Sequence, residues 1–416
     1  MARRPHALVI GGSLGGLLAA GMLRAAGCEA TVFERAADDL ASRGAGLGTR
    51  DELFLVMERI GIAVDASIGV AVPERICLDP SGRVTHRMRL PQTMSAWARI
   101  YRLLKDVLPR ERYRPGMALE RVEQDARGVT AVFSGGARVT GDLLVGADGI
   151  RSTVRAQLLP QVQPRYAGYV AWRGMLEERE IPRDIHAQIF ERYTFCLPEG
   201  EMMLSYPVPG RDDDTRPGRR GYNFVWYRPT EEREALARLC TDASGRCHGV
   251  AIAPPLIRPE LIAQVRSEAR ALLAPQVAEV VARTAQPFFQ AIFDLESPQV
   301  ACGRVALLGD AAFVARPHVG MGVTKAALDA QCLGDSIIAA GGDLDAALAR
   351  YDRERRHFGA RIVAHARRLG AYLEAQLKRR GQREVSELEQ RPERVMREIG
   401  SSAVDLREFA SPRGAS

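Results

Sequence analysis

The residues best suited to bind a ligand lie in a glycine-rich turn near the start of the chain. The stretch ALVIGGSLGGLLAAGMLRAAGCEATVFER holds Gly11, Ser13 and Gly16 at the three positions that a dinucleotide-binding turn keeps small. Ser13 replaces the middle glycine of that pattern, but its side chain is short. Bare backbone here lets N–H groups, including those of Gly12 and Leu14, approach a diphosphate closely. The spacing predicts a nucleotide-binding turn.

The neighbouring segments predict the elements that would position this turn. The apolar residues 7–10 indicate a buried parallel strand, residues 14–26 a helix that stops at Gly27, and residues 30–33 a second strand. The N-terminus of that helix would offer unpaired N–H groups and a positive dipole end to a diphosphate. The alternative is a turn whose glycines only let the helix pack against the sheet.

An acidic residue follows the second predicted strand. Glu34 lies 23 residues beyond Gly11, where a carboxylate can accept hydrogen bonds from an adenosine ribose. Its negative charge disfavours the 2′-phosphate of NADP, so FAD or NAD fits this position better. We include the next residue, Arg35, among the candidate nucleotide contacts.

A second acidic turn lies in the middle of the chain. Residues 143–145 predict a strand that leads to Asp148 and Gly149, with Ser152 at a plausible helix N-cap and Arg155 in the first helical turn. A carboxylate at the carboxyl end of a strand can hold a ribose or ribityl hydroxyl. The alternative is that Asp148 only caps the helix.

A third turn of the same kind follows residues 305–308, which also predict a strand. Gly309 and Asp310 come directly after it, and Asp310 has the same two interpretations as the earlier aspartate.

The composition is that of an ordinary globular protein. Hydrophobic residues make up 46% and charged residues 26% of the 416 residues, enough for two domains or one large α/β domain with an insertion. No apolar run reaches the length of a membrane span, and the N-terminal apolar stretch runs into the glycine turn rather than to a cleavage site. We therefore expect a cytoplasmic protein that does not interact with membranes.

Charge and cysteine content exclude other classes. The formal charge of +7 comes from arginines interleaved with acids, so we expect anionic small-molecule ligands rather than nucleic acid. The seven cysteines form no CxxC pair and do not cluster with histidines. We expect neither structural zinc nor a disulfide framework, and we assign no metal ligands.

The middle of the chain has a different character. The segments GYVAWRGML, YTFCLPEGEMMLSYPVPG and GYNFVWYR are typical of antiparallel strands. We predict a substrate domain over residues 161–298, to which residues 70–100 can contribute.

The nucleotide-binding domain is predicted to be discontinuous, over residues 1–160 and 299–340. A long C-terminal helix is predicted over residues 341–380. The remaining residues, 381–416, are polar and charged, and we expect this tail to be disordered in part.

The three turns, in this order, resemble those of a known family. An opening GxGxxG, a central DG and a later GD are shared by the FAD-dependent aromatic hydroxylases of the p-hydroxybenzoate hydroxylase class, which are flavoprotein monooxygenases. The stretches GYVAWRGML, YNFVWYR and GDAAFVARPHVGMG are most similar to the 2,6-dihydroxypyridine 3-monooxygenase branch. The resemblance runs from residue 5 to about residue 375 and implies an α/β fold: a Rossmann-like FAD-binding domain, an antiparallel-sheet substrate domain and C-terminal helices.

The resemblance also implies a reaction. NADH or NADPH reduces the flavin, O2 adds to form a C4a-hydroperoxide, and a small hydroxylated aromatic or pyridinol-like ring attacks the distal oxygen. The chain has one full dinucleotide fingerprint and no CxxxxC pair, so the nicotinamide cofactor is expected to visit the flavin transiently.

The loop after the third turn is the predicted catalytic loop. It contains Arg316, Pro317 and His318, followed by Gly320 and Gly322, and its N–H groups can face the pyrimidine edge of the isoalloxazine. A near-neutral pKa would let the histidine accept a proton from the substrate, and the arginine can pair with a substrate anion. A structural or solvated role is the alternative for both.

Two further groups of candidates complete the predicted site. Gly48, in the glycine-rich loop RGAGLGTR, can lie against the cofactor, or in a surface turn. Five aromatic residues of the insertion are candidate walls of a substrate pocket, with the core of the sheet as the alternative: Trp172, Tyr206, Tyr222, Phe224 and Trp226.

Two other functions stay open at this point. An FAD-linked dehydrogenase or reductase would use the same fold without inserting oxygen, and a flavin-binding carrier would not turn over at all. The basic residues 378–380 indicate a solvated face or a contact in a homodimer.

Overall fold

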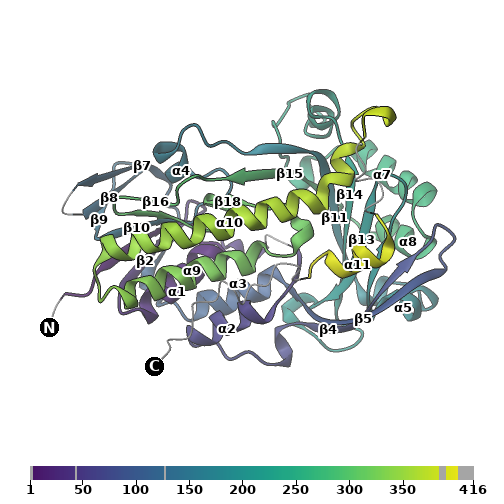
Figure 1. Cartoon of the computed structure of the whole chain (residues 1–416). Coiled ribbons are helices and arrows are strands. Elements are labelled where there is room, and N and C mark those ends of the chain that lie inside the picture. The colour runs from purple at the N-terminus through teal and green to yellow at the C-terminus, as the bar shows by residue number, and fades with distance from the viewer. Residues whose placement is uncertain (1–2, 43–44, 126–127, 384–389, 402–416) are drawn as a thin grey trace.

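The described part of the chain forms three β-sheets, whose strands are seen in Figure 1. The structure is a computed structural model that describes residues 3–42, 45–125, 128–383 and 390–401. The two larger sheets carry the predicted nucleotide turns and the aromatic segments, respectively.

The first sheet is built on the predicted βαβ unit. β1, β2, β6, β10 and β17 are parallel, and β16 joins one edge antiparallel. The near-continuous apolar character of β1 and β10 reflects burial on both faces, as is usual for parallel strands. In spatial order the strands are β16 (Ala301–Cys302), β17 (Val305–Leu307), β10 (Leu143–Gly146), β1 (His6–Ile10), β2 (Glu29–Phe33) and β6 (Tyr113–Arg114).

The second sheet has nine strands and is mainly antiparallel. Its β12 and β4 pair in parallel, and β3, β4 and β5 come from the first quarter of the chain, so residues 70–96 lie in this sheet. In spatial order the strands are β18 (Phe313–Val314), β15 (Phe288–Glu296), β11 (Arg165–Glu177), β14 (Gly221–Pro229), β13 (Met202–Val208), β12 (Arg192–Cys196), β4 (Val70–Leu78), β5 (Val84–Ala96) and β3 (Gly46–Gly48).

A small third sheet precedes the second acidic turn in the chain. It consists of β7 (Leu119–Asp125), β8 (Gly128–Phe133) and β9 (Arg138–Gly141), paired antiparallel. The α/β fold with an antiparallel second sheet and C-terminal helices is the predicted fold class, which is confirmed.

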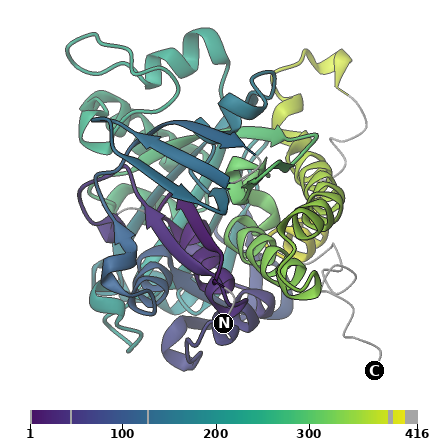
Figure 2. The same ribbon diagram turned by 90° about the vertical axis from the view of Figure 1, so that its left-hand side faces the viewer.

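The helices cover both large sheets. α9 and α10 lie side by side in Figures 1 and 2, with α9 also packed on α1. The helices are α1 (Leu14–Ala25), α2 (Asp51–Arg59), α3 (Trp97–Asp106), α4 (Thr153–Leu158), α5 (Arg183–Ile189), α6 (Ala237–Leu239), α7 (Pro259–Leu272), α8 (Pro275–Arg283), α9 (Gly322–Ala339), α10 (Leu344–Ala375) and α11 (Pro392–Glu398).

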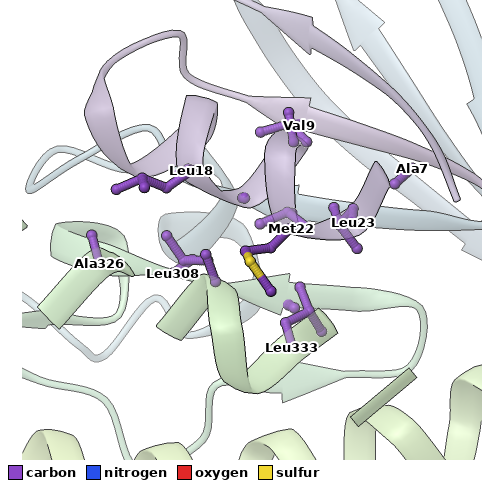
Figure 3. Packing of buried hydrophobic residues seen from close by; sticks show 14 of the residues in the cluster. Ala7, Val9, Leu18, Met22, Leu23, Leu308, Ala326 and Leu333 are labelled. Atoms are coloured by element: carbon purple, nitrogen blue, oxygen red, sulfur yellow. The ribbon is translucent and has the colours of Figure 1, made fainter. Parts of the chain in front are cut away.

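Small residues bring α1 and α9 together. A Cβ on Gly334 would lie 3.1 Å from the carbonyl oxygen of Met22, so only glycine fits this contact without displacement. In Figure 3 the Met22 side chain extends from α1 toward Leu333 on α9. Both side chains are fully buried. This interface positions α9, which begins at Gly322 after the loop that follows the third turn.

The structure contains two helical features that the sequence analysis does not predict. α8 follows α7 after a break at Leu273 and Ala274, because Pro275 cannot continue the preceding helix but suits the first turn of a new one. The polar tail contains α11, with Val395 and Met396 buried. Tail residues 384–389 and 402–416 lie outside the described residues.

Among the described residues, no helix combines the length and the apolar character that a membrane crossing requires. The same part of the chain has no cluster of three metal-ligating side chains.

We expect Leu333→Ala to lower the free energy of unfolding by about 3 kcal/mol, because it removes a buried side chain and leaves a cavity between α1 and α9. Ile338→Ala on the same helix is the control, since Ile338 is 55% exposed and its change should cost less than about 0.5 kcal/mol. Denaturant unfolding measures both, and equal losses would contradict this account of the interface.

Candidate active site

The three predicted turns lie at one edge of the parallel sheet. β1, β10 and β17 are adjacent parallel strands, so the turns at residues 11–16, 148–149 and 309–310 all follow carboxyl ends at the same edge. This is where open α/β sheets bind their ligands. Turns that are nearly 300 residues apart along the chain are thereby brought together.

Steric contact explains the glycines of the first turn. Gly11 has a φ of +106°, and a Cβ on it would lie 2.3 Å from the carbonyl oxygen of Ala147. A Cβ on Gly16 would lie 1.8 Å from the Gly11 oxygen. Ser13 is the N-cap of α1 and its side chain makes no capping hydrogen bond, while Leu14 is the buried first residue of the helix.

Glu34 braces the same turn. It is 7% exposed, and its carboxylate accepts hydrogen bonds from the N–H of Gly12 at 2.7 Å and of Ala36 at 2.9 Å. A carboxylate has further acceptor positions, so these two bonds leave capacity for a ribose hydroxyl. The neighbouring Arg35 is exposed.

The second turn caps a helix and also presents an unused acceptor. One carboxylate oxygen of Asp148 accepts from the N–H groups of Thr153 and Val154, at 2.7 and 3.3 Å. The other, Oδ1, is buried with no partner in the described part of the chain. Burial raises the pKa of Asp148. The capping alternative is thus present, and an acceptor remains for a ligand hydroxyl.

Arg155 links the second turn to the third. The side chain is buried and donates to the carbonyl oxygens of Ile150 at 2.6 Å and Ala311 at 3.1 Å. These contacts place Arg155 between the two turns, and the contact with the cofactor for which its position in the sequence makes it a candidate stays a prediction.

The third turn presents Asp310 to solvent. Its side chain is 52% exposed and lies 3.5 Å from Lys325, which is buried. The N–H of Gly309 donates to Asp329 at 3.0 Å, and that carboxylate forms a buried ion pair with Arg355 at 2.6 Å. Lys325, Asp329 and Arg355 were not predicted from the sequence, because they lie on α9 and α10 and become neighbours of the turn only after folding.

These turns fit a flavin dinucleotide. A Cβ placed on Gly149 or Gly322 would meet nothing within 4 Å, so backbone at both positions is open to a ligand. With the free oxygen of Asp148 and the exposed carboxylate of Asp310, the edge combines bare backbone with hydroxyl-binding acceptors. These are the groups that a diphosphate and a ribityl chain require.

The glycine-rich loop before α2 forms the edge strand β3 rather than a free loop. Three side chains of the second sheet hold Gly46: Tyr206 and Arg173 donate to its oxygen at 3.1 and 3.3 Å, and Asn223 accepts from its N–H at 3.2 Å. Gly48 pairs with β5, and Gly44 lies outside the described residues. Side chains from one face of the nine-stranded sheet therefore hold β3 at the edge of that sheet.

That face carries four tyrosines, which we call the tyrosine face: Tyr169, Tyr193, Tyr206 and Tyr227. They belong to one buried cluster and come from four strands of the sheet. Tyr206 is the one member proposed from sequence as a pocket residue.

The other four proposed pocket residues require correction. Trp172, Tyr222, Phe224 and Trp226 point to the opposite face, where they form a core with α7 and α8. Side chains alternate between the two faces along β14, but both faces carry aromatic residues, so the sequence pattern does not say which face the helices cover.

The pKa expected for His318 is wrong. The side chain is fully buried, its Nε2 lies 2.8 Å from the hydroxyl of Tyr169, and its ring centroid lies 4.3 Å from that of Tyr227. Burial, with a contribution from Arg316, lowers its pKa to about 3. The imidazole is therefore neutral near pH 7 and a weak base.

The predicted pairing of Arg316 with a substrate anion also requires correction. It is buried and paired with Asp294 at 2.8 Å and with Glu374 at 2.7 Å, so its charge is balanced inside the protein. Pro317 begins the short turn that carries His318, and Gly320 ends it with a φ of +61°.

The chain is similar to two families of FAD-binding domains and to several enzymes. The family described as FAD binding domain matches residues 4–207 and 256–366, and a second, FAD binding domain-like, matches residues 166–294. The chain is 32% identical to 2,6-dihydroxypyridine 3-monooxygenase of Paenarthrobacter nicotinovorans over 79% of this chain and 81% of that protein. It is 30% identical to an FAD-dependent urate hydroxylase of Klebsiella pneumoniae over 84% and 85% of the two chains.

Solved structures agree with these relatives. 2,6-Dihydroxypyridine-3-hydroxylase from Arthrobacter nicotinovorans superposes with a TM-score of 0.84 at 29% identity, covering 90% of this chain and 94% of that one. Klebsiella pneumoniae HpxO, solved with FAD and uric acid, gives 0.70 at 25% identity and 88% coverage of both chains. The predicted FAD cofactor is confirmed, and the chain belongs to the FAD-binding family of FAD-dependent aromatic hydroxylases.

Proposed function

We propose that this protein uses NADH or NADPH to hydroxylate a small hydroxylated aromatic or pyridinol-like ring. The observation that supports this best is the contact at 2.8 Å between Tyr169 of the tyrosine face and His318, which lies in the loop after the third turn. Aromatic walls beside a flavin suit a flat ring held next to the reactive part of the cofactor. Relatives named for a dihydroxypyridine and for urate support a hydroxylated ring substrate.

Bound FAD would supply the redox chemistry, taking two electrons from the nicotinamide and delivering one oxygen atom of O2 to the ring. The balance is one NAD(P)H, one proton, one O2 and one ring consumed, with a ring hydroxyl, NAD(P)+ and water formed.

The residues of this chain would hold the cofactor from three turns. The N–H groups of the first turn suit the diphosphate, the free oxygen of Asp148 suits a hydroxyl, and Asp310 suits the ribityl chain. The N–H group of Gly322, at the start of α9, suits the pyrimidine edge of the ring system, whereas the N–H of Gly320 already donates to the carbonyl oxygen of Pro317 at 2.9 Å.

Charge at the tyrosine face favours an ionised substrate. Arg173 lies beside Tyr206, since both donate to the oxygen of Gly46. A positive charge there stabilises a ring oxyanion, which is the electron-rich form that accepts oxygen. His318, neutral and bonded to Tyr169, would orient this wall and would not take the proton.

The proposed reaction is tested by offering heavy-isotope O2 and NADH or NADPH with three probes: 2,6-dihydroxypyridine, 3-amino-4-hydroxybenzoate and uric acid. We expect one probe to gain a single labelled oxygen, seen by mass spectrometry. Consumption of the nicotinamide with an unlabelled, reduced product would instead indicate a reductase, and an unlabelled, dehydrogenated product formed without consumption of NADH or NADPH would indicate a dehydrogenase. Yellow protein that is inert toward all three, and toward a wider set of phenols and pyridinols, would indicate a flavin carrier.

Asp310→Asn should weaken FAD binding about tenfold, because an ionised acceptor of a ribityl hydroxyl is lost. The side chain is half exposed, so the fold should tolerate the change. Fluorescence titration of the apoprotein with FAD measures the dissociation constant. Asp345→Asn, a 72% exposed aspartate on α10, is the control, and equal affinity of the two variants would contradict the assignment.

The lowered pKa of His318 makes stability depend on pH. The folded protein keeps the imidazole neutral down to about pH 3, while the unfolded chain takes up a proton below its ordinary value of 6.5. Stability from this group is therefore complete above pH 6.5 and is lost progressively as the pH falls toward 3.

We expect the loss of unfolding free energy between about pH 7 and about pH 5 to be smaller by about 2 kcal/mol in His318→Gln than in the unmodified protein. Denaturant unfolding at both pH values measures this difference. His357→Gln, at an exposed position on α10, serves as the control. An unchanged pH dependence in His318→Gln would contradict a neutral buried imidazole.

A further inference from the structure

The end of the described chain packs onto the tyrosine face. We call residues 392–401 the C-terminal strap; it consists of α11 and the three residues after it. Val395, Met396 and Ile399 are buried in the same cluster as the four tyrosines. The strap therefore covers the wall beside which the proposed substrate ring would lie.

A buried arginine holds the strap through its backbone. Arg75, on β4, is 1% exposed and donates from Nη1 to the carbonyl oxygens of Met396 at 2.6 Å and Ile399 at 2.5 Å. Its Nη2 donates to Gln92 at 2.7 Å, and its guanidinium lies 4.8 Å from the Tyr193 ring centroid.

The charge of this arginine has an unusual set of partners. No carboxylate of the described residues lies within ion-pair distance of Arg75, so carbonyls at the C-terminal end of α11 take that place. The negative end of a helix dipole stabilises a cation, and an unpartnered buried charge would be costly. Arg75 and the strap thus depend on each other.

The far end of the strap contacts the loop after the third turn. The N–H of Gly400 donates to the oxygen of His318 at 2.8 Å, and Gln92 donates to the oxygens of Gly400 at 3.2 Å and Thr49 at 3.4 Å. A Cβ on Gly320 would lie 2.7 Å from the Cα of Gly400. The strap bridges β4 and β5 of the second sheet to the loop after the third turn.

We propose that Arg75 is a positioning residue that holds residues 396–400 as the closing wall of the substrate site. This rests on the proposed function, because the wall matters for a reaction that water would divert to hydrogen peroxide. An ion pair of the strap with α10, between Arg368 and Glu398 at 3.0 Å, is partly exposed and contributes little.

The test is Arg75→Met in the FAD-loaded protein, with the probe that gives a labelled product. With bound FAD unchanged, we expect the KM for that probe to rise about tenfold and kcat for nicotinamide oxidation to change less than about twofold, because two hydrogen bonds to a charged donor are lost. Hydrogen peroxide formed per nicotinamide oxidised should rise severalfold. Arg75→Lys should restore part of the coupling, and Arg87→Met, at an exposed position of β5, should match the unmodified protein.

A second variant leaves the arginine in place. Gly400 has a φ of +66°, so Gly400→Ala strains the strap at its contact with His318. It should raise peroxide formation in the same direction. Iodide quenching of bound flavin fluorescence should also increase in Arg75→Met and Gly400→Ala, and this readout needs no turnover.

The outcomes separate the two proposals. If the unmodified protein inserts no labelled oxygen, the proposed function fails, and iodide quenching alone decides on the strap. If it does insert oxygen, unchanged coupling and quenching in both variants overturn the strap as a wall. A lower KM with unchanged coupling overturns it as well, because the strap would then obstruct the site. If Arg75→Met does not fold, Gly400→Ala decides.

Discussion

The site depends on the close approach of backbone at the carboxyl edge of the parallel sheet. β1, β10 and β17 end side by side, and the chain can turn there because Gly11 and Gly16 carry no side chain. Any Cβ at these positions would collide with a carbonyl oxygen, so the turn is fixed by steric exclusion. The candidate cofactor contacts of all three turns lie along this edge.

The second sheet becomes part of the site through a few polar contacts. Gly46 receives hydrogen bonds from Tyr206 and Arg173, and the hydroxyl of Tyr169 meets His318. The bonds to Gly46 hold β3 at the edge of the nine-stranded sheet, and the bond between Tyr169 and His318 joins that sheet to the loop after the third turn. Because the groups are buried, leaving one unpaired would cost the full desolvation of a polar atom, which makes the alignment of the two sheets specific.

Buried arginines around the site each have partners that carry negative charge or partial charge. The Arg316 guanidinium meets two carboxylates, and Arg355 meets Asp329, so these cations stabilise the loop and the helices around the third turn. Arg75 differs, since its partners are carbonyl oxygens of a short C-terminal helix. The same physical need for a partner is met there by the backbone of the C-terminal strap.

The sequence by itself determined the turns and the family, because steric and spacing requirements at Gly11, Gly16, Asp148 and Asp310 are local to a strand and the residues that follow it. The tertiary structure decided the rest. Alternation along β14 places aromatic residues on both faces, so only the docking of α7 and α8 shows that the tyrosines face the site. Likewise, burial rather than residue type set the neutral state of His318, and the three apolar residues of the strap form too short a pattern to predict a contact made across more than 300 residues.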